Sequence, residues 1–437
     1  MLIQRAVLLN GSAADIRVED QIVAISPALT PLPGEQVYDA NSATVVPGLH
    51  DHHVHLRSAA AALTSVRVGP AEVHSRADLT RVLAAADVGS DGWVRAVGYH
   101  EAVAGPLDRT VLDNLSPPVP VRVQHRSGVL WTLNSAGLAQ VGLADHPDGR
   151  LRSSDHYWSD TLQRNESGLA EVSRRLSAYG VTGVTDATPD LEIGDVVKLM
   201  AAHRRGELRQ RVHCLAPGKR ILHDTDLDLA GLTAWIAERH AEDVPVAVHC
   251  VTAAQLVITL AALRSAGRHP QDRIEHAAVV PDDSVADIVE VGATVVTQPN
   301  FVAERGDQYL NDVPTAEHHE LWRVGSLLAA KVPVALSTDM PFGHGDPWKA
   351  MRAAVSRTTG GGTVLGADEC VTARDALGMF FGAADAPAVQ RRIAPGQPGD
   401  LCILGAGPAE VLAELDSGMV VATIVAGNVV HGGALTG

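Results

Sequence analysis

The chain has 437 residues and a formal net charge of −16 at pH 7. Nucleic acids and anionic membranes would repel a surface of that charge, so we expect a small-molecule substrate and neither polyanion as a partner. The most apolar internal stretch, residues 251–263, is too short to span a bilayer, and four cysteines are too few for a disulfide framework. We therefore expect a cytoplasmic protein with reduced thiols, and homo-oligomer formation stays open.

Short runs of β-forming residues, separated by glycine and proline, occur at both ends of the chain. We expect them to pair as one small β-sandwich made of residues 1–46 and 385–437, with the domain of residues 47–384 inserted between them. The runs are residues 3–9, 21–25, 43–46, 400–404, 420–426 and 429–430.

Residues 45–55 read Val-Val-Pro-Gly-Leu-His-Asp-His-His-Val-His, which is typical of a buried strand that ends in a metal site. His53 and His55 are two residues apart, so on an extended segment they point to the same side and can bind one ion together. His52 would point away from that ion. A histidine-rich strand end can also be a polar rim, so the metal hypothesis depends on residues further along the chain.

Residues 58–165 form a long segment after this first strand, with strand-like runs at 93–99 and 119–124. An insertion at this point leaves the domain on the face where we expect the active site, so we predict a lid or substrate-specificity subdomain. The alternative is an excursion with no role in the reaction.

Strand-like and helix-like segments then alternate, which predicts an α/β fold. With the opening strand, the strand candidates number eight, so we predict a TIM-like (β/α)₈ barrel over residues 47–384 whose active site lies at the C-terminal ends of its strands. Only residues 216–218 separate the third and fourth strands, which is too short for a helix and predicts an irregularity there. The candidates after the first are residues 180–186, 211–215, 219–222, 246–249, 273–276, 293–298 and 334–339.

Polar residues recur at the predicted strand ends, where they would converge on one mouth of the barrel. Four imidazoles with one carboxylate form an N/O site suited to zinc or a related divalent ion. Each of these residues alone could be an ordinary structural residue, but their coincidence favours a metal site of one or two ions. The converging residues are His53, His55, Lys219, His249, His276 and Asp339.

Several ordered motifs resemble the amidohydrolase superfamily, in its N-substituted formamide deformylase-like (amidohydrolase-3) branch. The resemblance covers nearly the whole chain, and the ordered set is specific although each motif alone is weak. The motifs are Pro-Gly-Leu-His-Asp-His-His-Val-His at 47–55, Val-His at 248–249, Arg-Ile-Glu-His-Ala at 273–277, Gln-Pro at 298–299, Ser-Thr-Asp-Met-Pro at 337–341 and Pro-Gly-Asp-Leu at 398–401.

By this resemblance His53, His55 and Asp339 would hold a buried ion, and His249 with His276 a more exposed one. The family often bridges two ions with a lysine carboxylated by CO₂, because an ammonium group has no lone pair to offer. Lys219 stands in the only strand-like context among the four lysines and is the candidate for this role. The alternative is that Lys219 is a surface lysine and one metal suffices.

The chain departs from the family pattern ahead of Trp131, where many relatives carry a histidine and this chain has Gly128. Tyr99, His100 or His125 could supply that polar contact instead, or they could be ordinary loop residues. The residues we expect to contact substrate are Tyr99, His100, His125, Arg126, Trp131 and Gln298.

The resemblance implies metal-dependent hydrolysis of a C–N bond in a small amide-like substrate, by a metal-activated water. Asp339 would take the proton from the water and return it to the leaving nitrogen. The alternatives are a single-metal deaminase of an aminoheterocycle and, from another class, a non-catalytic scaffold on the same fold.

Overall fold

The computed structural model describes residues 1–152, 158, 162, 168–189 and 191–432. The chain divides into two compact units, Met1–His55 with Ala170–Gly437, and Leu56–Leu169, which we describe separately. The first unit contains both ends of the chain and all the predicted metal ligands. The second contains the segment 58–165 that the sequence predicts as an insertion. In the described part of the chain, each helix is too short or too polar to cross a membrane.

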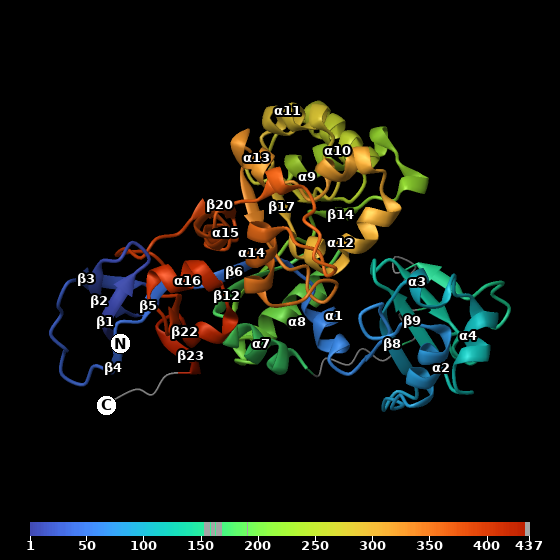
Figure 1. Ribbon diagram of the computed structural model, residues 1–437, viewed down its shortest axis with the longest axis horizontal. Helices are drawn as coiled ribbons and strands as arrows, with labels where there is room; N and C mark the ends of the chain where they lie inside the picture. The colour runs from blue at the N-terminus through green and yellow to red at the C-terminus, as the bar shows by residue number, and fades with distance from the viewer. Residues whose placement is uncertain (153–157, 159–161, 163–167, 190, 433–437) are drawn as a thin grey trace. The chain divides into compact units, whose positions relative to one another are not determined.

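Strands from the two ends of the chain form one mixed sheet, in the order β23-β22-β21-β5-β1-β2-β3, with β4 paired to β1 (Figure 1). The ends meet where β5 runs antiparallel to β21, with Val46 opposite Cys402. Pairing of the two ends is therefore confirmed, and the two-layer sandwich stays a prediction. The strands are β1 (Leu2–Leu8), β2 (Ala13–Val18), β3 (Ile22–Ser26), β4 (Val37–Asp39), β5 (Thr44–Pro47), β21 (Leu401–Leu404), β22 (Val420–Val425) and β23 (Asn428–Gly432).

Eight parallel strands make up the centre of the first unit, at the positions that the sequence predicts. They form a three-stranded sheet, β13-β12-β6, and a five-stranded sheet, β14-β15-β16-β17-β18. The strands are β6 (Leu49–Val54), β12 (Val181–Asp186), β13 (Arg211–Cys214), β14 (Lys219–Ile221), β15 (Ala247–Cys250), β16 (Arg273–His276), β17 (Thr294–Thr297) and β18 (Val334–Leu336).

The two parallel sheets are joined next to the predicted metal site. Just beyond the last residue of β18, the N–H of Asp339 donates to the carbonyl of His53 (3.0 Å), and the N–H of His55 donates to the carbonyl of Met340 (2.8 Å). At the other junction, the sheet order of the described residues contains no pairing between β13 and β14. The irregularity that the short connection predicts is present.

Helices occupy most of the connections between the parallel strands. Helix α10 begins after Thr252, whose side chain accepts a hydrogen bond from the N–H of Gln255, and it ends at Gly267. Helix α11 ends at Gly292 in the left-handed conformation. The helices of this unit are α7 (Leu169–Ala178), α8 (Ile193–Arg204), α9 (Leu229–Ala241), α10 (Ala253–Ala266), α11 (Asp282–Val291), α12 (Asn300–Asp312), α13 (Gly325–Ala329), α14 (Pro347–Ser356), α15 (Ala373–Gly378) and α16 (Pro408–Glu414).

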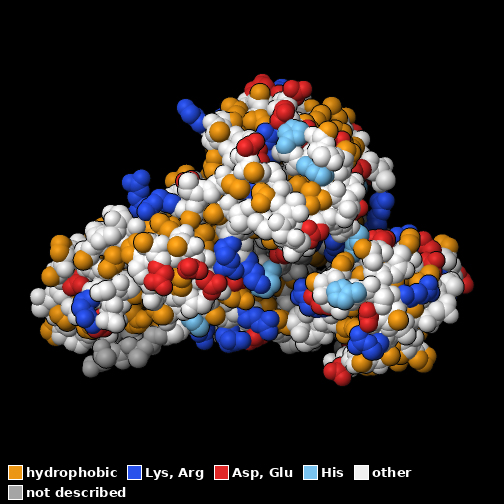
Figure 2. Space-filling view, viewed as in Figure 1, with side chains coloured by type: hydrophobic (Ala, Val, Ile, Leu, Met, Phe, Trp, Pro, Cys, Tyr) orange, Lys and Arg blue, Asp and Glu red, His pale blue; other side chains and the backbone are white. Residues whose placement is uncertain are grey.

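Acidic side chains gather over α11 on the face of the molecule that Figure 2 shows. That helix carries two aspartates in its first turn, where negative charge favours the positive end of the helix dipole. The excess of acidic residues in the chain is thus partly used to stabilise a helix end.

The second unit is built on a five-stranded sheet in the order β11-β10-β9-β8-β7. Two hydrophobic clusters form its core, one around Val94 and Val123 and the other around Trp93 and Trp131. Its elements are α1 (Leu56–Ala62), β7 (Val66–Arg67), α2 (Arg76–Ala84), β8 (Val94–Tyr99), α3 (Glu101–Ala104), α4 (Arg109–Leu115), β9 (Val121–His125), β10 (Leu130–Leu133), α5 (Ser135–Gln140) and β11 (Arg150–Arg152).

Candidate metal centre

Strand β6 and the residue that follows it, His55, present two sets of histidines in opposite directions, as the strand alternation predicts. His50 and His52 stack with ring centroids 4.6 Å apart, and His50 Nε2 lies 2.8 Å from Thr185 Oγ1. His53 and His55 belong to the other set, with ring centroids 5.3 Å apart. Only the second set faces the carboxylate that follows β18.

Asp339 meets this second set of histidines. Its Oδ1 lies 3.3 Å from His55 Nε2 and 3.7 Å from His53 Nε2. The three side chains are buried, and one potential ligand atom from each lies within 4.8 Å of the others. Nitrogen and oxygen atoms at this spacing surround a point that one divalent ion can reach.

His276 and His249 continue the cluster from β16 and β15. The ring centroids of His53 and His276 are 4.7 Å apart, and those of His276 and His249 are 4.5 Å apart. Four imidazoles from three strands therefore form one contiguous group.

Two of the predicted ligand histidines are each held at Nδ1 by a buried side chain. Glu275 Oε2 contacts His53 Nδ1, and Gln298 Oε1 lies 2.7 Å from His276 Nδ1. An oxygen acceptor at Nδ1 places the ring proton there and leaves the Nε2 lone pair for a metal.

Burial favours the neutral form of His53, His249 and His276. Loss of solvation lowers the pKa of His249 to about 3, with the positive charge of Lys219 adding to the effect. The same desolvation lowers the pKa values of His53 and His276 well below 6.5. Neutral imidazole is the form that binds metals.

Two charged groups in the site lack a hydrogen-bond partner among the described residues. They are Lys219 Nζ and Asp339 Oδ1, and both atoms are buried. A buried, unpartnered polar atom costs free energy unless something satisfies it. The donor set and the unpartnered carboxylate oxygen both fit a divalent cation.

Lys219 differs in position from the other predicted ligands. It is the first residue of β14 and pairs with Ala247, whereas His249 pairs with Ile221 at the other end of that strand. The expectation that Lys219 stands at a strand end with His249 is therefore wrong, although its side chain is buried. Burial lowers the pKa of Lys219 to about 8, so roughly a tenth of the amine is neutral at pH 7, far more than for an ordinary lysine.

The residues expected to contact substrate are divided between the two units. Gln298 is fully buried beside the histidines, and its amide nitrogen donates to Ser337 Oγ (2.7 Å). The others belong to the second unit, where Tyr99 and Trp131 are packed in hydrophobic clusters. The N–H of Arg126 donates to the Tyr99 carbonyl (2.8 Å). Their contact with substrate stays a prediction.

His100 and His125 lie on either side of Glu101 in the second unit. Their Nε2 atoms are 3.8 Å and 3.1 Å from Glu101 Oε2. Each Nδ1 accepts a backbone N–H, from Ala102 in one case and Ser127 in the other. His125 Nε2 is within hydrogen-bond distance of Glu101, and one potential ligand atom from each of the three residues lies within 4.8 Å of the others, a spacing that could also hold a metal ion.

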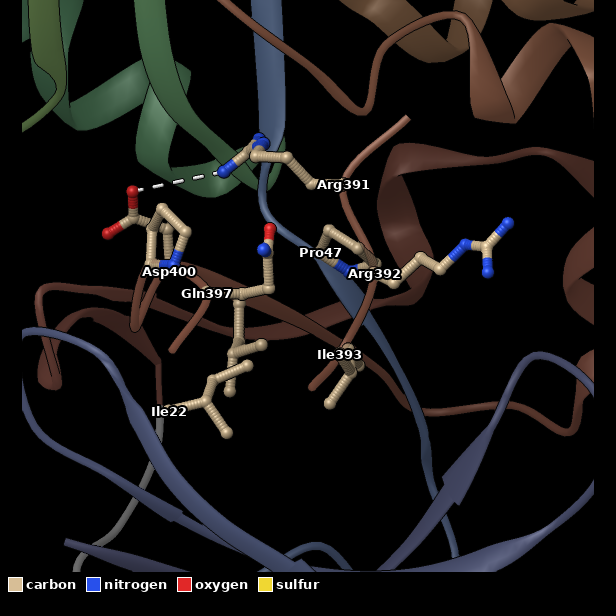
Figure 3. Close-up of a pocket in the computed structure, with 9 residues that line it drawn as sticks. Ile22, Pro47, Arg391, Arg392, Ile393, Gln397 and Asp400 are labelled. Atoms are coloured by element: carbon tan, nitrogen blue, oxygen red, sulfur yellow. Dashed lines mark ion pairs between the residues drawn. The ribbon is translucent and has the colours of Figure 1, made fainter. Parts of the chain in front are cut away.

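A small pocket elsewhere in the first unit lies beside the terminal sheet (Figure 3). Arg391 and Asp400 face each other across it at 3.9 Å, and Asp400 also accepts from Arg211 Nε at 2.7 Å. None of the predicted metal ligands lines this pocket. Because Arg391 and Asp400 pair with one another, we assign the pocket a structural role.

Three buried charged residues around the site were not among the predicted site residues. Asp51 accepts hydrogen bonds from Thr338, and Arg273 donates to Glu275. The signal was available, since Arg273 and Glu275 are charged residues two apart in a strand predicted to be buried. A buried strand tolerates such residues only when they pair.

Residues 36–431 match the model of a family described as the amidohydrolase family. The chain belongs to the amidohydrolase family. Among curated proteins, this amidohydrolase is 25% identical over 434 residues to an N-substituted formamide deformylase from Arthrobacter pascens, and the match covers 80% of each chain.

Solved structures support the fold of this amidohydrolase. An uncharacterized metal-dependent hydrolase from Pyrococcus horikoshii aligns with a TM-score of 0.75 at 18% identity, over 96% of this chain and 99% of the other. A 5-methylcytosine deaminase from Klebsiella pneumoniae aligns with a TM-score of 0.58 at 15% identity, over 100% and 98% of the two chains. The fold is therefore α/β and TIM-barrel-like.

Proposed function

We propose that this protein is a metal-dependent hydrolase that cleaves a C–N bond of an amide-like small molecule. The observation that carries the proposal is the convergence of His53 and His55 on Asp339, with Nε2–Oδ1 distances of 3.7 Å and 3.3 Å. Membership of the amidohydrolase family supports the same reaction class.

His53, His55 and Asp339 would hold one divalent ion, and His249 with His276 a second. Zinc suits this mixture of imidazole and carboxylate ligands. When bound, such an ion acts as a Lewis acid, polarising a carbonyl oxygen and lowering the pKa of water to roughly 7.

Asp339 is the general base and acid in this proposal. Its Oδ1 is buried and has no hydrogen-bond partner among the described residues, so it is available to receive a proton from the attacking water. The same carboxyl would then return the proton to the nitrogen that leaves when the C–N bond breaks.

Lys219 is the candidate for carboxylation by CO₂. Its Nζ is buried near the ligand histidines, and a pKa of about 8 provides the neutral amine that this reaction requires. The product would carry oxygen atoms and a negative charge, and would then be able to bridge two ions.

The eight parallel strands would close as a (β/α)₈ barrel around this centre, despite the missing pairing between β13 and β14. The segment 58–165 would act as a lid, and the protein would work in the cytoplasm on a small molecule.

The curated relative is an N-substituted formamide deformylase, which makes N-formyl compounds the first substrates to test. The experiment is a screen of N-formyl, N-acyl, cyclic-amide and aminoheterocycle compounds for release of ammonia or amine, with Asp339→Asn as the matched control. Metal-dependent release by the wild type alone supports the proposal. A metal-loaded protein without activity on all four classes would favour the scaffold alternative.

A further inference from the structure

Glu275 is fully buried between a cation and a predicted metal ligand. It accepts from Arg273 Nε at 2.6 Å through Oε1 and from Arg273 Nη2 at 3.1 Å through Oε2. The same Oε2 contacts His53 Nδ1. Arg273 Nη2 also donates to the carbonyl of His52 at 2.7 Å, so one guanidinium orients both the carboxylate and the strand that carries the histidine.

The corresponding partner of His276 is a neutral amide. Gln298 Oε1 lies 2.7 Å from His276 Nδ1, and Ser337 Oγ holds the orientation of that amide by accepting from its nitrogen at 2.7 Å. A carboxylate at Nδ1–H makes the opposite ring nitrogen a stronger donor than a neutral oxygen does. The two histidines therefore differ in donor strength because of residues that do not themselves face the ion.

We propose that Glu275, oriented by Arg273, is a positioning residue that fixes the Nδ1–H form of His53 and makes the site of His53, His55 and Asp339 the tighter of two metal sites. Gln298 fixes the Nδ1–H form of His276 but strengthens its metal binding less. A metal ion bound by His249 and His276 therefore exchanges more readily. This inference rests on the proposed function, since it concerns how the metal of that hydrolase is held.

The test is Zn²⁺ affinity of the full chain, measured by competition with a chromophoric chelator. Glu275→Gln keeps the side-chain shape and should weaken the tighter ion by about 10 to 100-fold, the range typical for partners of metal ligands. The matched control, Gln298→Met, removes the amide beside His276 and should weaken only the second ion. A change below about twofold in Glu275→Gln, or loss of the same ion in both variants, would overturn the inference.

A second measurement uses the wild-type protein, so it does not depend on whether the Glu275→Gln variant folds. Nitrogen NMR of the protein with ¹⁵N-labelled histidine reports which ring nitrogen carries the proton. His53 should be protonated at Nδ1 in the metal-free protein as well as in the Zn²⁺-loaded one. A proton at Nε2 of metal-free His53 would contradict the positioning role.

The two proposals can fail separately. Absence of divalent-ion binding by the wild-type protein would refute the proposed hydrolase. The tautomer of His53 in the metal-free protein would still decide the role of Glu275. Full Zn²⁺ affinity of the Glu275→Gln variant would refute only the positioning role of Glu275.

Discussion

Individual residues at the site adopt backbone conformations that non-glycine residues rarely take. His276 has φ 71°, Ala277 has φ 46° and Asp339 has φ 56°. Left-handed conformations of this kind cost roughly 1–3 kcal/mol each and persist only when surrounding contacts enforce them. At Asp339 those contacts include Asp51, which accepts from the Thr338 N–H at 3.0 Å and from its hydroxyl at 2.5 Å.

Replacement of Asp339 by Asn tests its proton-transfer role. The amide keeps one oxygen ligand but loses the charge and the basicity, so metal is expected to remain in part while proton transfer fails. General acid–base catalysis contributes about 10² to 10⁴-fold, so kcat should fall at least about a hundredfold. The measurement is kcat at matched metal occupancy, and a loss below about tenfold would rule the role out.

Replacement of Lys219 by Met tests the bridging role. The variant fills a similar volume without a nitrogen, so the buried pocket stays packed while carboxylation becomes impossible. We expect metal content to fall from about two ions to at most about one, because the shared ligand is lost. Unchanged metal content in the folded variant would show that the lysine is structural. Lys331→Met, at an exposed lysine that is not among the predicted metal ligands, is the control.

At the scale of elements, an ion pair holds a loop against the sheet that the two ends of the chain form. Arg17 on β2 donates to Glu35 through Nε at 2.7 Å and Nη2 at 2.9 Å, and Glu35 also accepts from the Leu32 N–H at 2.9 Å. The hydrogen bonds from Arg17 lower the pKa of Glu35 from 4.5 to about 2. The folded state thus favours the ionised form more than the unfolded state does.

A depressed carboxyl pKa gives stability that is present above pH 4.5 and is lost as the pH falls from there through about 2. Glu35→Gln should therefore unfold at lower urea concentration than the wild type at pH 7, and the gap should narrow between pH 4.5 and pH 2. The measurement is the urea concentration at the unfolding midpoint of both proteins across that pH range. A gap that does not depend on pH would show that the pair contributes nothing through ionisation.

Elements whose residues alternate or run apolar were predictable, and those that owe their form to distant partners were not. Strand β2 was missed because Asp15 and Arg17 interrupt its apolar pattern, yet Asp15 is buried and accepts from the N–H groups of Arg5 and Leu29. The convergence of the histidines and Asp339 was predictable because metal-binding residue types recurred at strand ends, and their role as ligands stays a prediction. The charged pair Arg273 and Glu275 stands two residues apart in one strand and could be noticed in the sequence, but the contact of Glu275 with His53 becomes apparent only once the strands are placed together.

At the scale of the whole molecule, the second unit starts at Leu56, directly after the predicted ligand His55. A chain that leaves at this point starts from the ends of the strands that carry the site, so we predict that Leu56–Leu169 covers the site entrance. An experimental structure with a bound substrate analogue should place residues of this unit against the ligand. A structure with the unit at the opposite ends of the strands would refute the lid.

The most direct test of the central claim is the metal content of protein purified without chelators, read by elemental analysis. We predict about two divalent ions per chain, with zinc the main one, and a loss of occupancy in His249→Ala and in His276→Ala. About one ion per chain would favour the single-metal alternative over the two-metal site. Protein without any bound divalent ion that also fails to take up added Zn²⁺ would contradict the account.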